Sequence, residues 1–388
     1  MSHRSSLSYF ALCAVALLTI LSGSMINPLL SIFAKNIGAT GVIVGLVVAS
    51  YWTSRVFLEI PSGLLSSKLG YFTPMALGLS LTSLGNFLCR FVNNPYQLMM
   101  ARMMIGLGAP LFYAVAMTFV VDTFTTERRG SAMGFFQGVE FIGTLLGASL
   151  SGYVVSIFEF RGAFLLSAAL GATALALLAV SGIRGKRRAE ADSSIISPSS
   201  ILEVLRSRNL LVVAGSIFAE FVLSTGVLYT ILPIYLKEEV GLSLTTVGLT
   251  LAARSFGFVT SMFIMGTISD RFGRRPVLIF GLTATGLLSI ALSHASSVPF
   301  IAATIFGIGL STGAIWIVSP VIAAESVRPA LRGAAIGTYR TFFDLGSILG
   351  PIIMTIINEG LGRRMCFYVA AMILLANVLP ALWMRETR

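Results

Sequence analysis

Twelve long apolar runs constrain this chain more than any other feature of its sequence. The hydrocarbon core of a bilayer is about 30 Å thick, so a spanning helix needs about 20 consecutive, mostly apolar residues. Only helices and closed barrels satisfy their backbone hydrogen bonds in lipid, and uninterrupted runs of this length indicate helices. The runs are Leu7–Phe33, Gly41–Leu64, Thr73–Phe91, Pro95–Val121, Ser131–Phe158, Ala163–Ile183, Leu210–Tyr235, Ser243–Ile268, Pro276–Ala295, Pro299–Ala324, Gly333–Ile357 and Met365–Trp383. We therefore predict an all-α membrane protein with twelve transmembrane helices.

The low charge of the chain agrees with a surface that faces lipid. Only 11% of the residues are charged and 56% are hydrophobic, whereas a soluble domain carries about 25% charged residues. The net charge of +11 could suggest nucleic acid, but the charges fall in short clusters between apolar runs, with no basic helix interleaved with aromatic residues. We therefore expect the lipid bilayer, and no nucleic acid, as the macromolecular partner.

The positions of the lysines and arginines predict the orientation. Of the 27, 17 fall in connections on one side, 6 on the other and 4 inside the runs. Cytoplasmic loops are enriched in these residues, so we expect a multi-pass protein of the inner (plasma) membrane with both termini in the cytoplasm. The first run could be read as a signal peptide, but it continues to Phe33 without a clear cleavage site, and we interpret it as a membrane helix.

An internal repeat with a constant spacing divides the chain into halves. A spacing of 203 residues separates Arg129 from Arg332, Gly134 from Gly337, Gly63 from Gly266, Gly70 from Gly273, Gly147 from Gly350 and Phe164 from Phe367. Six predicted helices, an even number, lie between the copies, so both halves enter the membrane from the same side as parallel repeats. We predict two pseudo-symmetric six-helix bundles, residues 1–183 and 209–388, joined by a cytoplasmic linker over 184–208.

The loop after the eighth predicted helix carries a specific motif, Gly266-Thr-Ile-Ser-Asp270-Arg271-Phe-Gly273-Arg274-Arg275. It matches the pattern G-x-x-x-D-R-x-G-R-R, and the chain thereby resembles the major facilitator superfamily of transporters over its whole length. The first-half copy keeps Gly63, Lys68 and Gly70 but lacks the acid. The resemblance implies the fold of that family, with two six-helix bundles around a central substrate site.

The resemblance also implies a cytoplasmic latch that holds the outward-facing state. Carried over, Asp270, Arg274 and Glu325 would form its intact cluster in the second half. The matching first-half positions, Ser67, Tyr71 and Asp122, cannot form the same network, so we predict a lopsided latch that depends mainly on the second half. The alternative is that the loop charges only hold the loop in the cytoplasm.

Two further patterns indicate the 12-helix drug or metabolite:proton antiporter group. Arg102-Met-Met-Ile-Gly106-Leu-Gly108 resembles the family's R-x-x-x-G-x-G motif. Glycines at 134, 143, 147 and 152 keep most of the spacing of an antiporter motif in the fifth helix. Close helix packing is the alternative explanation for these glycines.

Ionisable side chains inside membrane helices are costly and are functional candidates by default. Arg55 and Glu59 are four residues apart, as are Arg340 and Asp344, so each pair can meet on one helix face. Such pairs can be purely structural. Our candidates for proton coupling are Glu220, Glu140, Asp344, Glu59 and Arg102.

Glu220 stands out because no opposite charge lies within one helical turn of it. Burial without a partner disfavours the ionised form, which suits a carboxyl group that takes up and releases a proton. The alternative is an ion pair with Arg102 or Arg254 on another helix.

Polar and aromatic residues on helices of the cavity-lining type predict the substrate site. They are Asn27, Tyr51, Trp52, Gln137, Tyr229, Trp316, Tyr339 and Arg340. This mixture favours an amphipathic organic molecule over a sugar phosphate, although each residue alone could serve packing or the headgroup region.

We therefore predict a secondary active transporter that works by alternating access, with proton-coupled efflux of small amphipathic molecules as the main hypothesis. The main alternative is a proton symporter or uniporter that imports a metabolite, and a membrane enzyme or a non-transporting receptor are minor ones. No catalytic or metal-binding pattern is apparent around the two histidines and three separated cysteines. We expect no cofactor, no metal and no enzymatic activity, with a small molecule and protons as partners of a monomer.

Overall fold

The computed structural model describes residues 3–183, 206–295, 297–328 and 331–386. The predicted linker lies almost entirely outside these residues. Helices make up the described chain, which contains no strand, and eleven helical stretches are long and apolar enough to cross a membrane. The all-α membrane fold predicted from the sequence is therefore confirmed.

In the described residues the first half contains seven elements, of which η1 and α2 continue the path of α1. They are α1 (His3–Ser24), a short 3-10 turn η1 (Asn27–Leu29), α2 (Leu30–Asn36), α3 (Val42–Leu69), α4 (Phe72–Cys89), α5 (Pro95–Thr123) and the long α6 (Thr126–Val180). Pro28, which lacks a backbone N–H, lies in η1 where the first predicted run is interrupted.

Helix α6 explains why eleven stretches are found where we predicted twelve helices. Its 55 residues would extend about 80 Å if straight, far more than a bilayer core. The backbone leaves the helical region at Glu159, with φ 56° and ψ 174°, between the predicted runs Ser131–Phe158 and Ala163–Ile183. α6 therefore contains the first of these runs and all but the last three residues of the second.

The second half contains α8 (Arg208–Phe221), the π-helix η2 (Val222–Ile231), α9 (Leu232–Glu238), α10 (Leu244–Phe272), α11 (Arg274–Ser293), α12 (Val298–Glu325), α13 (Arg332–Leu361), α14 (Arg363–Ala376) and α15 (Val378–Leu382). The run predicted over Leu210–Tyr235 is thus one continuous helix with a π-helical centre. Hydrogen bonds from residue i to i+5 define this form, which is rare and is frequently found at functional sites.

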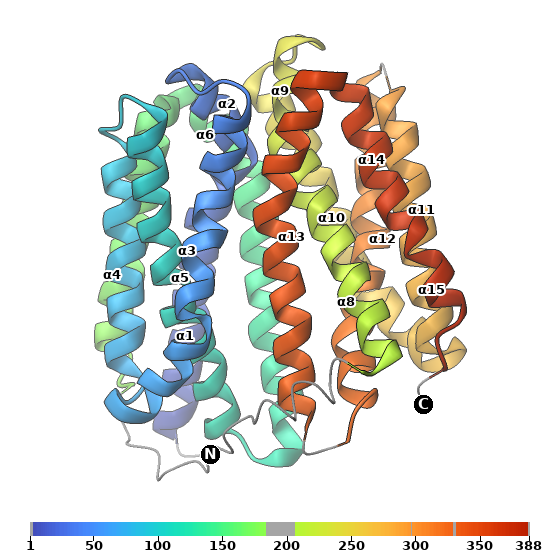
Figure 1. Ribbon diagram of the computed structural model, residues 1–388. Helices are drawn as coiled ribbons and strands as arrows, with labels where there is room; N and C mark the ends of the chain where they lie inside the picture. The colour runs from blue at the N-terminus through green and yellow to red at the C-terminus, as the bar shows by residue number, and fades with distance from the viewer. Residues whose placement is uncertain (1–2, 184–205, 296, 329–330, 387–388) are drawn as a thin grey trace. The chain divides into compact units, whose positions relative to one another are not determined.

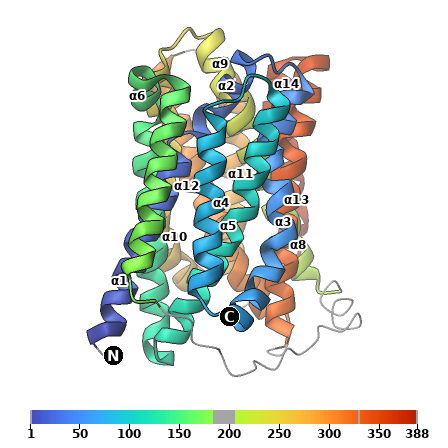
Figure 2. The same ribbon diagram turned by 90° about the vertical axis from the view of Figure 1, so that its left-hand side faces the viewer.

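The chain forms two compact units, residues 1–39, 46–193 and 244–249 in one, and 40–45, 194–243 and 250–388 in the other. In the first unit, α1 packs on α6 and α4 on α5, with Leu12, Phe112 and Phe136 in the core; Figure 2 shows α4 beside α5. In the second, α13 packs along α8 and η2, and α11 along α12 (Figure 1).

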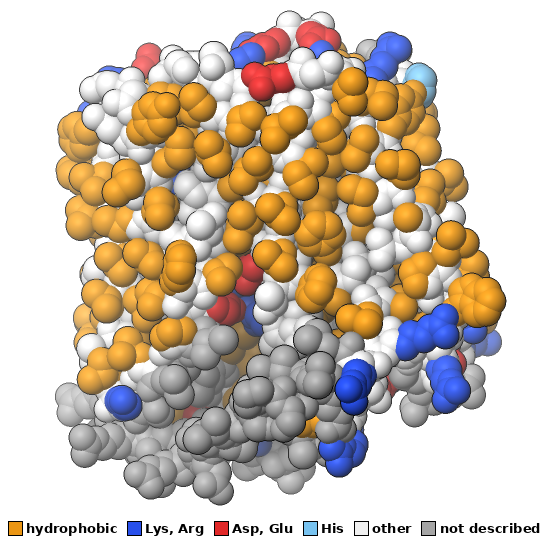
Figure 3. Space-filling model, in the orientation of Figure 1, with side chains coloured by type: hydrophobic (Ala, Val, Ile, Leu, Met, Phe, Trp, Pro, Cys, Tyr) orange, Lys and Arg blue, Asp and Glu red, His pale blue; other side chains and the backbone are white. Residues whose placement is uncertain are grey.

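Large hydrophobic side chains are exposed in both units, among them Phe57 and Phe263. On the face seen in Figure 3, hydrophobic side chains cover most of the middle of each unit, and most of the visible charged side chains lie toward the helix ends. Lipid tails can cover this surface, as water would not.

Candidate functional site

A buried ion pair lies inside the second unit. The Glu220 carboxylate, on α8, is 3% exposed, and its Oε1 lies 3.1 Å from Nη2 of Arg254 on α10. Ser224 donates a hydrogen bond to the same oxygen at 2.6 Å and accepts one from Arg254 Nη2 at 2.6 Å. Of the two partners considered from the sequence, Arg254 is the one that pairs with Glu220.

The π-helix η2 gathers the remaining contacts of Arg254. Ser224 and Tyr229 are five residues apart on η2, and in an α-helix they would point roughly 140° apart. Bonding from i to i+5 brings such residues toward one face. Arg254 accordingly donates to the Tyr229 hydroxyl at 3.4 Å and lies 5.6 Å from the centre of its ring.

The geometry leaves one carboxylate oxygen open. Glu220 Oε2 is buried and has no hydrogen-bond partner among the described residues. A buried polar atom without a partner is uncommon and calls for an explanation. Oε1 is held by Arg254 and Ser224, so Oε2 is the atom on which this side chain could accept a proton.

An aromatic cluster lies next to the ion pair. Phe221, which follows Glu220, has its ring centre 4.0 Å from that of Phe343 and 6.0 Å from that of Trp316. Trp316 also contacts the ring of Phe258 at 6.3 Å. The predicted cavity residue Trp316 therefore belongs to an apolar aromatic wall in the second unit.

The first unit contains a partly open cavity of about 100 Å³ lined by α1, η1, α3, α4 and α5. Asn27, Tyr51 and Arg102, predicted separately, all line it, together with Asn86 and Tyr113. Arg102 is 6% exposed, and its guanidinium carbon lies 5.1 Å from the centre of the Tyr51 ring.

The other predicted residues lie at varied positions. Arg55 and Glu59 form the expected i, i+4 ion pair at 3.2 Å, and Arg55 lies 5.3 Å over the Trp52 ring. The remaining predicted residues are partly buried (Glu140, Arg340), buried (Asp344, Tyr339) or exposed (Gln137). Their roles in coupling or substrate binding stay predictions.

The motif loop contains one of the contacts that the resemblance implied, the ion pair between Arg274 and Glu325. Arg274 Nη2 pairs with Glu325 Oε1 at 2.9 Å. Asp270 is exposed and has no contact with Arg274 or Glu325 among the described residues, and its role in a latch stays a prediction. The carboxyl group of Asp270 lies on an outer turn at the end of α10, and among the described residues it makes no ion pair or side-chain hydrogen bond.

The two halves carry equivalent contacts at this point. Tyr71 and Asp122, which lie 203 residues before Arg274 and Glu325, form a 2.6 Å hydrogen bond from the Tyr71 hydroxyl to Asp122 Oδ2. A hydrogen bond in the first half thus replaces the ion pair of the second. Lys68 and Arg271, which lie nearby in the sequence, are exposed. Gly63 and Ser67 lie outside the residues whose side chains the structure describes.

Two motif glycines are required by the backbone. Gly70 has φ 76° and Gly273 φ 98°, values that side chains with a Cβ rarely adopt. Both residues lie at the tight turn between two antiparallel helices, α3–α4 and α10–α11. Gly266, by contrast, has open space around it.

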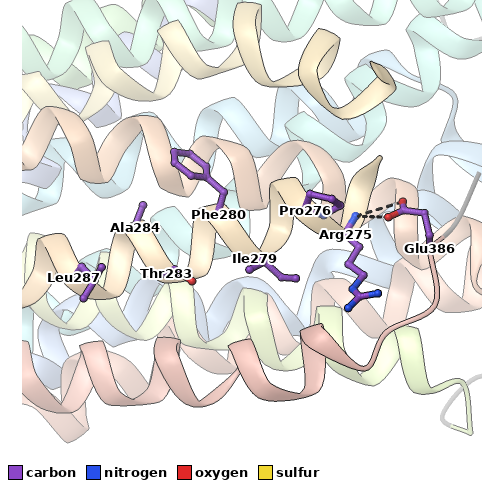
Figure 4. A pocket seen from close by; sticks show the side chains of 8 residues that line it. All are labelled: Arg275, Pro276, Ile279, Phe280, Thr283, Ala284, Leu287 and Glu386. Atoms are coloured by element: carbon purple, nitrogen blue, oxygen red, sulfur yellow. Dashed lines mark hydrogen bonds between the residues drawn. The ribbon is translucent and has the colours of Figure 1, made fainter. Parts of the chain in front are cut away.

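The start of α11 is capped by an acid that the sequence did not single out. Glu386 Oε1 accepts from the backbone N–H of Arg274 at 2.7 Å, and its carboxylate also faces the N–H of Arg275 (Figure 4). Arg275 in turn donates to the carbonyl of Leu382. A carboxylate at a helix start satisfies free N–H groups and the helix dipole.

A shallow groove of about 660 Å³ continues from this cap along α11. Figure 4 shows Ile279, Phe280 and Leu287 along it. Phe280 and Leu287 are about half exposed. The groove is an outer, apolar surface of the kind that lipid covers, and none of the predicted substrate residues lines it.

Helix packing explains two of the glycines used to predict an antiporter. A Cβ at Gly143 would lie 3.2 Å from the carbonyl oxygen of Leu17, and one at Gly147 would lie 2.9 Å from that of Leu21. Both glycines therefore let α6 approach α1 closely. Gly143 and Gly147 are therefore no separate evidence for antiport.

Comparison with known proteins decides the family. The family model described as Major Facilitator Superfamily matches residues 12–228 and 217–388. The chain belongs to the Major Facilitator Superfamily. It is similar to the uncharacterized MFS-type transporter YcaD of Salmonella typhimurium and of Salmonella typhi, with 25% identity over 365 residues, 93% of this chain and 91% of each relative.

Solved structures show the same fold at 14% identity. The nucleoside transporter NupG, as a D323A mutant, superposes with a TM-score of 0.84, covering 97% of this chain and 99% of NupG. A bacterial homologue of the human lysosomal transporter Spinster gives 0.80, covering 99% and 97%. The chain is thus a multi-pass membrane transporter of this superfamily rather than an enzyme, as predicted from its motif loop.

Three residues of these sites escaped the sequence analysis. Ser224 looked like an ordinary small helix residue, although its position four residues after Glu220 was a usable signal. Asn86 is an amide inside a predicted membrane helix, which also merited attention. Nothing in the sequence marks Glu386 as a cap, because the chain returns to α11 only in the folded structure.

Proposed function

We propose that this transporter couples the movement of small amphipathic organic molecules to protons and that Glu220 carries the proton. The observation that supports the proposal is the buried Glu220–Arg254 pair, whose second carboxylate oxygen has no hydrogen-bond partner among the described residues. Buried acids in transporter helices commonly belong to proton relays.

The chemistry of the pair links protonation to a change in charge. With Glu220 ionised, its negative charge balances Arg254. A proton on Glu220 removes this balance and leaves the Arg254 cation in a low-dielectric interior, which is costly. Proton binding therefore favours any conformation that gives Arg254 water or another anion.

Coupling follows if the two access states differ in proton affinity. A proton can shift a conformational equilibrium only by its difference in affinity for the two states. In this proposal the outward-facing and inward-facing states provide different surroundings for Arg254, so that a proton gradient drives the cycle in one direction.

The side chains around the pair support an amphipathic substrate. Phe221, Trp316 and Phe343 form an aromatic cluster, and Tyr229 has a hydroxyl group that accepts a hydrogen bond from Arg254. Aromatic rings offer large apolar area, and the hydroxyl group can orient a polar substituent. We propose export across the inner membrane by a monomer with both termini in the cytoplasm.

Import of a metabolite by symport or uniport is the alternative on the same fold. The likeness to NupG, a nucleoside transporter, makes this alternative concrete. It would use the same ion pair with the opposite direction of substrate movement, so a sided assay separates the two.

Proteoliposomes that contain a pH-sensitive dye test the coupling. An imposed proton gradient would be followed while amphipathic compounds and metabolites are added one at a time. We would compare the wild type with Glu220→Gln and with the control Glu239→Gln, which alters an exposed acid paired with Arg363. Substrate-evoked proton flux in the wild type and the control, but not in Glu220→Gln, supports the proposal.

Two other outcomes would reject it. Substrate movement without proton flux in all three proteins would indicate a facilitator. Unchanged flux in Glu220→Gln would move the proton to another acid, with Glu140, Asp344 and Glu59 as the next candidates. Reversing the gradient and measuring on which side substrate accumulates distinguishes export from import.

A further inference from the structure

The cavity of the first unit contains buried hydrogen-bond donors that have nothing to bind. Arg102 is 6% exposed and Asn86 3%, and both line the cavity. Arg102 Nε and Asn86 Nδ2 are buried without a hydrogen-bond partner among the described residues. Among the described residues Arg102 also makes no ion pair, and its guanidinium carbon lies 5.1 Å from the centre of the Tyr51 ring.

Two other arginines in membrane helices are paired with carboxylates. Arg55 has Glu59 at 3.2 Å and Arg254 has Glu220 at 3.1 Å. Leaving one charge buried without its partner costs about 3–5 kcal/mol where it has been measured in proteins. Within the described residues, Arg102 thus carries a cost that the chain avoids for Arg55 and Arg254.

A missing acceptor accounts for this arrangement. A water molecule could accept the hydrogen bonds of Arg102 and Asn86, but it would bring no negative charge. An anion supplies both the hydrogen-bond acceptor and the negative charge. The ring of Tyr51 lies against the guanidinium group and holds its plane, which suits the forked contact of arginine with a carboxylate.

The size of the cavity defines what part of a ligand fits. An apolar cavity of about 150 Å³ can take a benzene molecule, and this one measures about 100 Å³. It has room for a compact acid group and a carbon or two. A phosphate monoester would bring up to two negative charges to a single arginine, which makes a monoanion the better match.

We infer that Arg102 and Asn86 form a subsite for the carboxylate of an organic acid. The inference rests on the proposed transport function and narrows its substrate class from amphipathic molecules in general to those with an apolar body and one carboxylate. Arg102 supplies the charge and the forked donors. Asn86 supplies a second donor from α4, and the apolar side chains of Ile105 and Phe112 line the cavity beside them.

Thermal unfolding of the purified protein in detergent at pH 7.5 tests the subsite without any proton gradient. The probes are matched pairs of a carboxylate and its neutral amide: benzoate and benzamide, phenylacetate and phenylacetamide, octanoate and octanamide. A ligand at about 100 times its Kd raises Tm by roughly 5–10 °C in a unit of this size. We expect at least one carboxylate to give such a rise and its amide to give little.

Three variants locate the effect. Arg102→Gln should lose the difference between carboxylate and amide, whereas Arg161→Gln, which removes an exposed arginine bound to Asn93, should keep it. Without ligand, Arg102→Gln should unfold at or above the wild-type Tm, because a costly buried charge is gone. If Arg102→Gln fails to fold, Asn86→Leu decides, with a reduced carboxylate effect expected.

The inference is overturned if no pair separates carboxylate from amide in the wild type, or if Arg102→Gln keeps the full difference. Because binding is measured at equilibrium and without a gradient, a transporter that proves not to be proton-coupled can still show the carboxylate effect. A coupled transporter can equally fail to show it, so the two proposals are judged separately.

Discussion

Removing both members of the Glu220–Arg254 pair should harm the protein less than removing one. The two side chains are 3% and 14% exposed and 3.1 Å apart. Loss of one partner of a buried pair costs about 3–5 kcal/mol. We expect about 3 kcal/mol for Glu220→Gln and for Arg254→Gln, at the lower end because Ser224 still offers a hydrogen bond to the remaining side chain.

The double variant should lose only about 1–2 kcal/mol, because two neutral amides can bond to each other. One kcal/mol changes Tm by about 2–4 °C for a unit of 150–250 residues. Each single variant should therefore unfold about 6–12 °C below the wild type, with the double variant above both. Thermal unfolding of the four proteins in detergent, followed by the loss of the monodisperse peak, measures this.

An exposed pair provides the control for this cycle. Arg363 and Glu239 are in contact, but the Glu239 side chain is 54% exposed, so their coupling should stay below about 1 kcal/mol. A double Glu220/Arg254 variant less stable than either single variant, by the sum of their losses, would refute the reasoning. The two groups would then not depend on each other in the folded protein.

Three other experiments test separate features. Gly226→Ala should strongly lower Tm, because its Cβ would lie 2.6 Å from a backbone oxygen of α13, whereas Gly337→Ala, with open space around it, should leave Tm within about 1 °C. Glu386→Ala should cost about 0.5–2 kcal/mol of stability by removing the cap of α11, and no change in Tm would argue against the cap. In cysteine-accessibility labelling of the helix ends beside the two motif loops, Arg274→Gln should increase exposure more than Tyr71→Phe, because an ion pair is lost in the first variant and a hydrogen bond in the second. Equal effects would contradict the lopsided latch.

Helix positions could be predicted from the sequence because lipid imposes a strict requirement on length and polarity. Pro28 and the break at Glu159 interrupt helices near the ends of predicted runs, but every predicted run still lies mainly in helix. The repeat and the motif loop sufficed to indicate the family. These features are local in the sequence, or depend on a regular spacing that the sequence displays directly.

Contacts between helices could not be predicted in the same way. Glu220 and Arg254 are 34 residues apart, and which faces of α8 and α10 meet depends on packing that no local pattern records. The same applies to Glu386, which reaches α11 from the far end of the chain. Asp270 was placed in the latch by family pattern alone, and a pattern does not fix the direction of a side chain.

The π-helical turns of η2 have a mechanical consequence. A helix with i to i+5 bonding holds more residues in each turn than an α-helix, so a change to i to i+4 bonding would rotate the side chains along it about the helix axis. If η2 took up α-helical bonding, Tyr229 would rotate by roughly a quarter turn relative to Ser224, while Glu220 and Ser224, four residues apart, would keep their contact. A change of hydrogen bonding within this one helix would therefore break or restore the contact of Tyr229 with Arg254. Helix α9, which follows η2 directly, would rotate with it.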